Sequence, residues 1–139
     1  MKNLKRLVLY REKRYSDRLV DKPSLDENKY VLSEKLAEEI AQYLESGLIL
    51  LEFVSPTTDP YNEQDEIRFA ILTDGVYLWD WIIINWIRKY RVRLPDDFLN
   101  YFERVKKHPE DRSQLDLDDI MDQVEFAEDI FIEPVNKTM

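Results

Sequence analysis

The residues between 57 and 66 are the first candidates for chemistry, because oxygen-bearing side chains are dense there. These side chains are Asp59, Asn62, Glu63, Asp65 and Glu66. Carboxylate and amide oxygens are the ligands that Ca²⁺ and Mg²⁺ prefer. The segment lacks the glycine and the alternating spacing of a calcium-binding loop, so we expect a solvated acidic loop with no metal and no cofactor. A metal-dependent hydrolase, or another enzyme that uses loop 57–66, remains the alternative.

The single histidine, His108, is the next candidate. It follows the basic residues Arg104, Lys106 and Lys107, where a protonated ring would interact favourably with the end of a helix. A catalytic histidine needs a nucleophile or a carboxylate partner, and the sequence singles out none. The chain also has no cysteine and only two glycines, and it contains no phosphate-binding or hydrolase motif. We therefore expect no catalytic residues.

Composition narrows the class of protein further. The chain has 139 residues and a net charge of −9, a length typical of one domain, which we expect to span 1–139. Its acidic character disfavours a nucleic-acid partner, and no apolar run reaches the roughly 20 residues of a membrane helix. The absence of cysteine fits a reducing compartment. These features predict a cytoplasmic protein that binds neither nucleic acid nor membrane.

The first half of the chain predicts strands around one helix. Residues 4–10 and 48–54 are apolar runs typical of strands, and we expect the second strand to be buried on both faces. Between them, Ser33 is a good N-cap and Gly47 a good helix end, with apolar residues at helical spacing. Residues 67–73 and 76–79 flank Asp74-Gly75, the pair typical of a type I′ hairpin turn.

The second half predicts three helices. Residues 80–90 allow a strand or a helix, and we favour the helix because Asp80 makes a fair N-cap. Residues 95–107 begin with acids and end with bases, as the helix dipole favours. Residues 116–130 would form a last helix with a core face of five apolar residues, namely Leu117, Ile120, Met121, Val124 and Ala127. The elements predict an α+β fold, in which about four helices cover a small antiparallel sheet with a central hairpin.

Two surfaces are candidates for binding a protein partner. On a helix from 116 to 130, a stripe of carboxylates lies opposite the apolar face and is interrupted by no lysine or arginine: Asp118, Asp122, Glu125 and Asp129. Such a stripe would attract a basic partner such as a toxin domain, and a solvated face is its simpler explanation. On the helix 80–90, Trp81 points away from the predicted core, near Ile84 and Arg88. This second patch suits a partner or self-association, and packing beneath the N-terminal segment is the alternative.

Several segments within about 47–102 carry a resemblance to a known class of proteins. They are Thr58-Asp59-Pro60-Tyr61, the hairpin Thr73-Asp74-Gly75-Val76-Tyr77-Leu78-Trp79, Tyr90, and Leu94-Pro95-Asp96-Asp97-Phe98. In this pattern the chain resembles small bacterial proteins related to immunity proteins of polymorphic toxin systems. It departs from the usual pattern at Asp80, where a proline commonly follows the tryptophan. The resemblance implies a non-enzymatic interaction protein that binds and neutralises a cognate toxin. An assembly subunit is a further alternative, and the sequence leaves the oligomeric state open.

Overall fold

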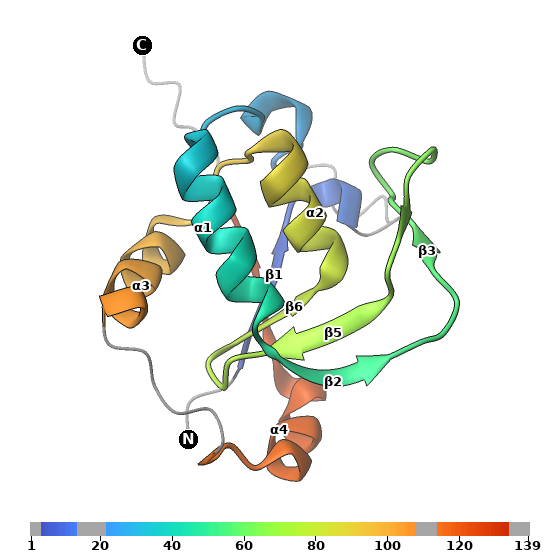
Figure 1. The fold of residues 1–139 in the computed structure, drawn as a ribbon, viewed down its shortest axis with the longest axis vertical. Coiled ribbons are helices and arrows are strands. Elements are labelled where there is room, and N and C mark those ends of the chain that lie inside the picture. Colours follow the sequence, from blue (N-terminus) through green and yellow to red (C-terminus); the bar gives the residue numbers. More distant parts are fainter. Residues whose placement is uncertain (1–3, 14–21, 108–113, 134–139) are drawn as a thin grey trace.

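A five-stranded sheet forms the centre of the molecule (Figure 1). The computed structural model describes residues 4–13, 22–107 and 114–133, and His108 lies outside these ranges. The strands follow the spatial order β2 (Leu48–Glu52), β5 (Ala70–Thr73), β6 (Tyr77–Asp80), β1 (Lys5–Leu9) and β7 (Glu128–Phe131). The helices are α1 (Glu34–Glu45), α2 (Trp81–Tyr90), α3 (Asp96–Lys107) and α4 (Leu117–Gln123). The predicted α+β class is confirmed.

The sheet is mixed, whereas the sequence predicted an antiparallel one. Strands β2, β5 and β6 are antiparallel neighbours, but β1 lies parallel to both β6 and β7. Parallel neighbours need a long connection, and α1, β2 and β5 lie between β1 and β6 in the chain. A further small sheet pairs β3 (Thr57–Thr58) with β4 (Glu66–Ile67). Short 3₁₀ turns complete the described elements: η1 (Arg11–Lys13), η3 (Asp26–Asn28) and η5 (Val124–Phe126).

Helix α1 begins and ends where the sequence predicted. The Ser33 hydroxyl accepts a hydrogen bond from the Leu36 N–H, which caps the first turn. Gly47 follows the helix, and a Cβ placed there would lie 2.6 Å from Cζ2 of Trp79. The indole Nε1 of Trp79 donates to the carbonyl of Leu44. Close contact between the end of α1 and the buried tryptophan of β6 therefore requires a residue without a side chain at position 47.

The predicted hairpin is present, but its turn differs from type I′. The last residues that pair in register are Thr73 and Leu78. Only Gly75 in the turn has a positive φ, at +94°, whereas a type I′ turn needs two such residues. Instead, Oδ1 of Asp74 accepts hydrogen bonds from the N–H groups of Val76 and Tyr77. The Asp74 side chain thus supplies the turn, in the manner of an Asx turn.

Asp74 also connects the turn to two helices. Its Oδ2 accepts hydrogen bonds from the hydroxyls of Tyr43 on α1, at 2.5 Å, and Tyr101 on α3, at 2.7 Å. Burial, and then the neighbouring Asp74 carboxylate, raise the pKa of the Tyr101 hydroxyl well above its usual value. Tyr101 therefore stays protonated and donates its hydrogen bond at neutral pH.

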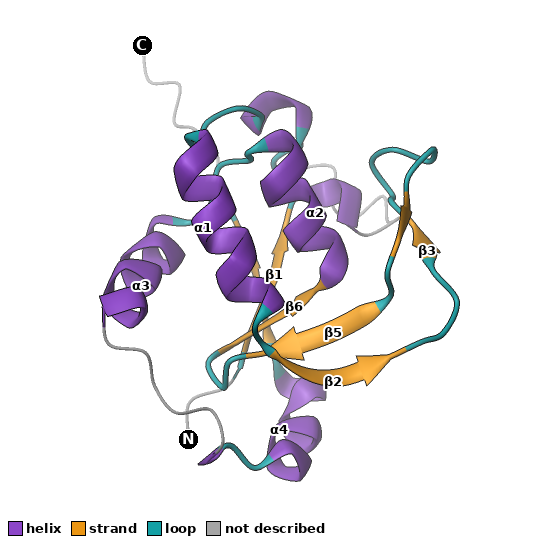
Figure 2. Cartoon of the chain, viewed as in Figure 1, coloured by secondary structure: helices purple, strands orange, loops and turns teal. Residues whose placement is uncertain are grey.

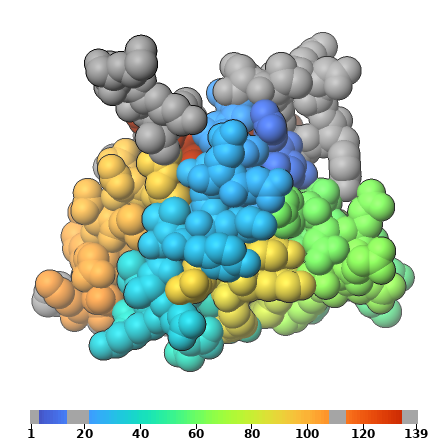
Figure 3. Space-filling view, turned by 90° about the horizontal axis from the view of Figure 1, so that it is seen from above, coloured from blue at the N-terminus to red at the C-terminus, as the bar shows by residue number. Residues whose placement is uncertain are grey.

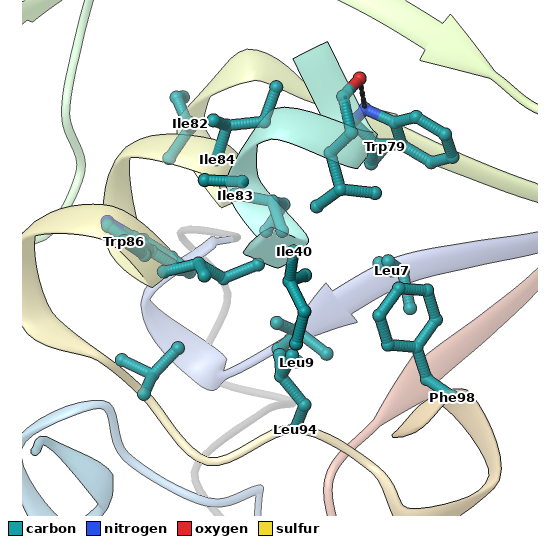
Figure 4. Packing of buried hydrophobic residues seen from close by; sticks show 14 of the residues in the cluster. Leu7, Leu9, Ile40, Trp79, Ile82, Ile83, Ile84, Trp86, Leu94 and Phe98 are labelled. Carbon is teal, nitrogen blue, oxygen red and sulfur yellow. Dashed lines mark hydrogen bonds between the residues drawn. The ribbon is translucent and has the colours of Figure 1, made fainter. Parts of the chain in front are cut away.

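Residues 81–90 are helical, as favoured, and α2 lies beside α1 on one face of the sheet (Figures 2 and 3). Six of its ten residues are buried. Figure 4 shows Ile83 and Trp86 of α2 pointing toward Ile40 of α1 and the strand residue Leu9. The predicted cap is wrong in one respect, because the Asp80 side chain makes no capping hydrogen bond and forms an ion pair with Lys13 at 2.5 Å.

Strand β2 was expected to be buried on both faces, and this prediction is wrong. It is an edge strand that pairs with β5 alone within the described part of the chain. Ile49, Leu51 and the following Phe53 and Val54 are exposed. An unbroken apolar run is typical of a central strand, but among the described residues β2 has a strand on one side only.

The prediction of one helix over 116–130 is wrong, and it is the largest difference between the expected and the observed fold. The chain forms α4 as far as Gln123, turns through η5, and then enters β7 beside β1. The Glu128 N–H donates to the carbonyl of Leu4, which starts the pairing. Ile130, Phe131 and Ile132 favour strand structure, and the free edge of β1 gives their backbone groups hydrogen-bond partners. Pairing with the sheet thus overrides the helical spacing of the apolar residues.

Candidate functional site

The carboxylates of the predicted stripe fall on three different elements. Asp118 and Asp122 lie on α4, Glu125 on η5 and Asp129 on β7. Asp129 is bound to the sheet through an ion pair with Arg6, at 3.0 Å between Oδ1 and Nη1. The stripe as predicted does not exist, because it required a helix through residue 129. Asp118, Asp122 and Glu125 remain exposed on one continuous segment.

This segment also exposes three large apolar side chains. Leu117, Met121 and Phe126 keep 40%, 45% and 64% of their surface accessible. The sequence predicted Leu117 and Met121 in the core, and this is wrong, since Ile120 is the buried residue of α4. Helix α4 is only seven residues long, and one of these residues is buried against the rest of the protein. Phe126 was not among the residues of the predicted core face, and its exposure could have been predicted from this.

We call these residues together the α4–η5 surface: Leu117, Met121, Phe126, Asp118, Asp119, Asp122 and Glu125. Its four carboxylates form no ion pair with any lysine or arginine in the described ranges. One local bond occurs, from the amide of Gln123 to Asp119. Apolar side chains and uncompensated negative charge therefore share one surface.

The fold holds this surface at both ends. At the start, the Asp116 carboxylate caps α4 by accepting from the N–H groups of Asp118 and Asp119, and Leu115 packs against Gly75 of the hairpin. At the end, Nη2 of Arg6 on β1 donates to the carbonyl of Val124. The surface is thus positioned by the central strands (Figure 1), which limits the ordering cost of binding a partner.

The second predicted patch forms only in part: Trp81, Ile84 and Arg88 line one hollow of about 240 Å³, but they do not all face outward. Ile84 is completely buried, contrary to its expected place on an outward face. Arg88 forms ion pairs with Glu38 and Glu45 of α1, at 2.8 and 2.6 Å. Trp81 is half-buried beneath the guanidinium of Arg68, whose Cζ lies 4.5 Å from the ring centroid. The three residues stabilise the packing of α2 against its neighbours, because each already has a partner within the chain.

The acidic loop 57–66 is partly structural. Asp59 was expected in a solvated loop but is completely buried. Its Oδ1 accepts from Nε1 of Trp86 and the Tyr61 N–H, and its Oδ2 accepts from the Asn85 amide. These hydrogen bonds connect the loop to α2, and both carboxylate oxygens of Asp59 take part in them. In the described ranges, no three histidine, cysteine or acidic side chains are grouped so as to hold a metal ion.

An open cleft of about 680 Å³ lies between β7 and the start of α3. The charged residues that line it carry both signs: Lys5, Lys22, Arg93, Asp96, Asp97, Glu128, Asp129 and Glu133. No serine, threonine, cysteine or histidine occurs among its described lining residues. Its described lining therefore contains no serine or cysteine nucleophile paired with a histidine base, and we place the candidate site on the α4–η5 surface.

Two further observations concern membrane-spanning helices and similarity to known proteins. None of the helices in the described ranges has the length and apolar character needed to cross a membrane. Comparison of the chain with known protein families, with curated proteins and with solved structures gave no match.

Proposed function

We propose that this protein is a non-catalytic interaction protein whose α4–η5 surface binds a basic protein partner. One observation carries the proposal. Leu117, Met121 and Phe126 are exposed among four carboxylates that form no ion pair within the described ranges. The apolar side chains favour association by removal of their surface from water, and the carboxylates favour a partner of opposite charge.

The two parts of the surface would have different roles in binding. Phe126 is the most exposed of its three apolar residues, and a protruding aromatic ring that enters a pocket on a partner is a common energetic centre of protein interfaces. Charges at the rim act mainly on the rate of association, and their effect falls as salt rises. We therefore expect Phe126 to determine dissociation and the carboxylates to determine association.

Immunity to a toxin is the form of interaction that the sequence resemblance suggests. An immunity protein acts by occupying a surface of its toxin, so it needs a stable fold and an exposed binding surface, with no catalytic group of its own. A basic toxin domain, such as a nuclease, would complement the charge of α4 and η5. This form of the proposal rests on the resemblance within 47–102 and on the charge of the α4–η5 surface.

A photo-crosslinking experiment in cells tests the proposed surface. A benzophenone amino acid is placed at Phe126 and, as the matched control, at Phe53, another exposed phenylalanine. We expect a specific protein other than this chain to crosslink from position 126 and not from position 53, and the purified partner to have an excess of lysine and arginine. Absence of a specific crosslink at 126, or a partner that crosslinks equally from 53, would contradict the proposal.

A protection assay tests the immunity form. The partner identified by crosslinking is produced alone and then together with this protein. We expect growth to stop in the first case and to continue in the second, with protection lost when Phe126 is changed to alanine and kept when Phe53 is changed. A partner that is harmless when produced alone would refute the immunity form and leave the binding proposal standing.

A further inference from the structure

Strand β2 presents a second apolar surface, separate from α4 and η5. It lies at the edge of the sheet, with β5 as its one neighbour within the described ranges. Four exposed apolar residues lie in the strand or directly after it: Ile49 and Leu51 within β2, and Phe53 and Val54 beyond its end. An exposed edge strand offers unpaired backbone N–H and carbonyl groups to another strand, and proteins usually protect such edges with charges or prolines.

The β2 edge carries almost no net charge. Glu52 is its single charged residue, and Arg68 of the adjacent segment forms an ion pair with it. The opposite edge of the sheet, β7, contains Glu128 and Asp129, and the α4–η5 surface carries four carboxylates. Two copies of a chain with net charge −9 repel each other over most of their surface. The β2 edge is a place where two copies can approach without opposing like charges.

We propose that the end of β2 and the two residues that follow it pair in antiparallel fashion with the same residues of a second copy of this chain. The bulge between Ile49 and Leu51 bends the first half of the strand, so we place the pairing over 52–54, at the end of β2 and before Pro56. A two-fold axis at Phe53 sets the two Phe53 rings opposite each other, which favours pairing across strands. It also sets each Glu52 opposite Val54 and keeps the two carboxylates apart. The interface is isologous and closes as a dimer.

Sedimentation equilibrium from about 5 to 500 µM at physiological salt tests the dimer, since one strand gives an interface at the small, weak end of the known range. Val54→Lys is the disrupting variant, because the Val54 side chain is fully exposed and its replacement leaves the core intact. Val31→Lys is the matched control, because Val31 is also exposed, at 54%, and lies before α1. We expect a monomer–dimer equilibrium that Val54→Lys weakens at least tenfold and Val31→Lys leaves unchanged.

Two results would overturn the proposal: a monomer at every concentration, or a dimer that neither Val54→Lys nor Phe53→Lys weakens. Hydrogen exchange adds a positional readout: the Phe53 N–H already donates to the Phe69 carbonyl within the chain, so protection is expected to rise with protein concentration at the amides of Glu52 and Val54. The dimer is independent of the proposed partner surface. Phe126→Ala should therefore leave the dimer unchanged, and Val54→Lys should leave partner binding unchanged.

Discussion

Helices α2 and α4 both follow an aspartate at the N-cap position, yet they differ in what they bury. In α2, six of ten residues are buried against α1 and the sheet. In α4, one of seven residues is buried, and its neighbours Leu117 and Met121 are exposed. The apolar residues of α2 therefore contribute to the stability of the fold, whereas the exposed Leu117 and Met121 of α4 contribute little to it. Exposed apolar residues that do not stabilise the fold are available to a partner.

The largest expected difference is between an aromatic residue of α2 and one of η5. Trp86→Ala removes a fully buried ring and should lower the free energy of unfolding by about 3 to 5 kcal/mol. Phe126→Ala, the matched change on the exposed surface, should alter it by less than about 0.5 kcal/mol. Urea denaturation followed by circular dichroism measures both. A loss of several kcal/mol in the Phe126 variant would mean that the α4–η5 surface belongs to the core.

The next effect compares two aspartates. Asp59→Ala leaves the Trp86 indole N–H and the Asn85 amide without their acceptor, and it should cost about 2 to 3 kcal/mol of stability, because buried donors lose their partner. Asp122→Ala removes an exposed carboxylate and should change stability by less than about 0.5 kcal/mol. Equal melting temperatures for the two variants would contradict the structural role of Asp59.

A smaller effect is expected at the hairpin that supports α4. Gly75→Val places a branched side chain at a φ of +94°, and its Cβ would lie 2.9 Å from Cδ2 of Leu115. We expect a loss of about 2 kcal/mol, mostly from backbone strain, together with faster amide exchange in α4. Unchanged stability would show that the turn does not need the left-handed conformation.

The smallest effect on stability should come from charge reversal. Changing both Asp122 and Glu125 to lysine removes neighbouring like charges, which should leave the free energy of unfolding unchanged or raise it by up to about 0.5 kcal/mol. The matched reversal of Glu38 and Glu45 breaks both ion pairs of Arg88 and should lower stability slightly, because exposed ion pairs contribute little. In binding, only the first reversal should slow association with the partner, mainly at low salt. If neither the charge reversal nor the salt concentration changes the association rate, the carboxylates are only a solvated surface and do not attract the partner.

Local signals explain why much of the fold was predictable. Ser33 and Gly47 mark the limits of α1 through capping and backbone geometry, and Asp74-Gly75 marks the hairpin. These residues act on their immediate neighbours, so their effects are visible in sequence spacing. The position of β2 at the edge was not predictable in this way, because exposure of Leu51 depends on which elements lie beside the strand.

The candidate site was predictable only in part, and for a related reason. Asp118, Asp122 and Glu125 were recognised by charge and are exposed as expected. Phe126 was missed and Asp129 was misplaced, because residues 128–131 pair with β1, which is more than a hundred residues earlier in the chain. Helical spacing carries no information about such a distant partner.

The most direct test of the central claim is the affinity of the purified partner for Phe126→Ala and for Phe53→Ala, measured by titration calorimetry. Both variants remove an exposed phenylalanine, with 64% and 52% of its surface accessible, so a general loss of apolar surface affects them alike. We predict that Phe126→Ala weakens binding at least tenfold, about 1.4 kcal/mol, and that Phe53→Ala leaves the affinity unchanged. Equal affinities for the wild type and the Phe126 variant, or a loss confined to the Phe53 variant, would contradict the assignment of the α4–η5 surface.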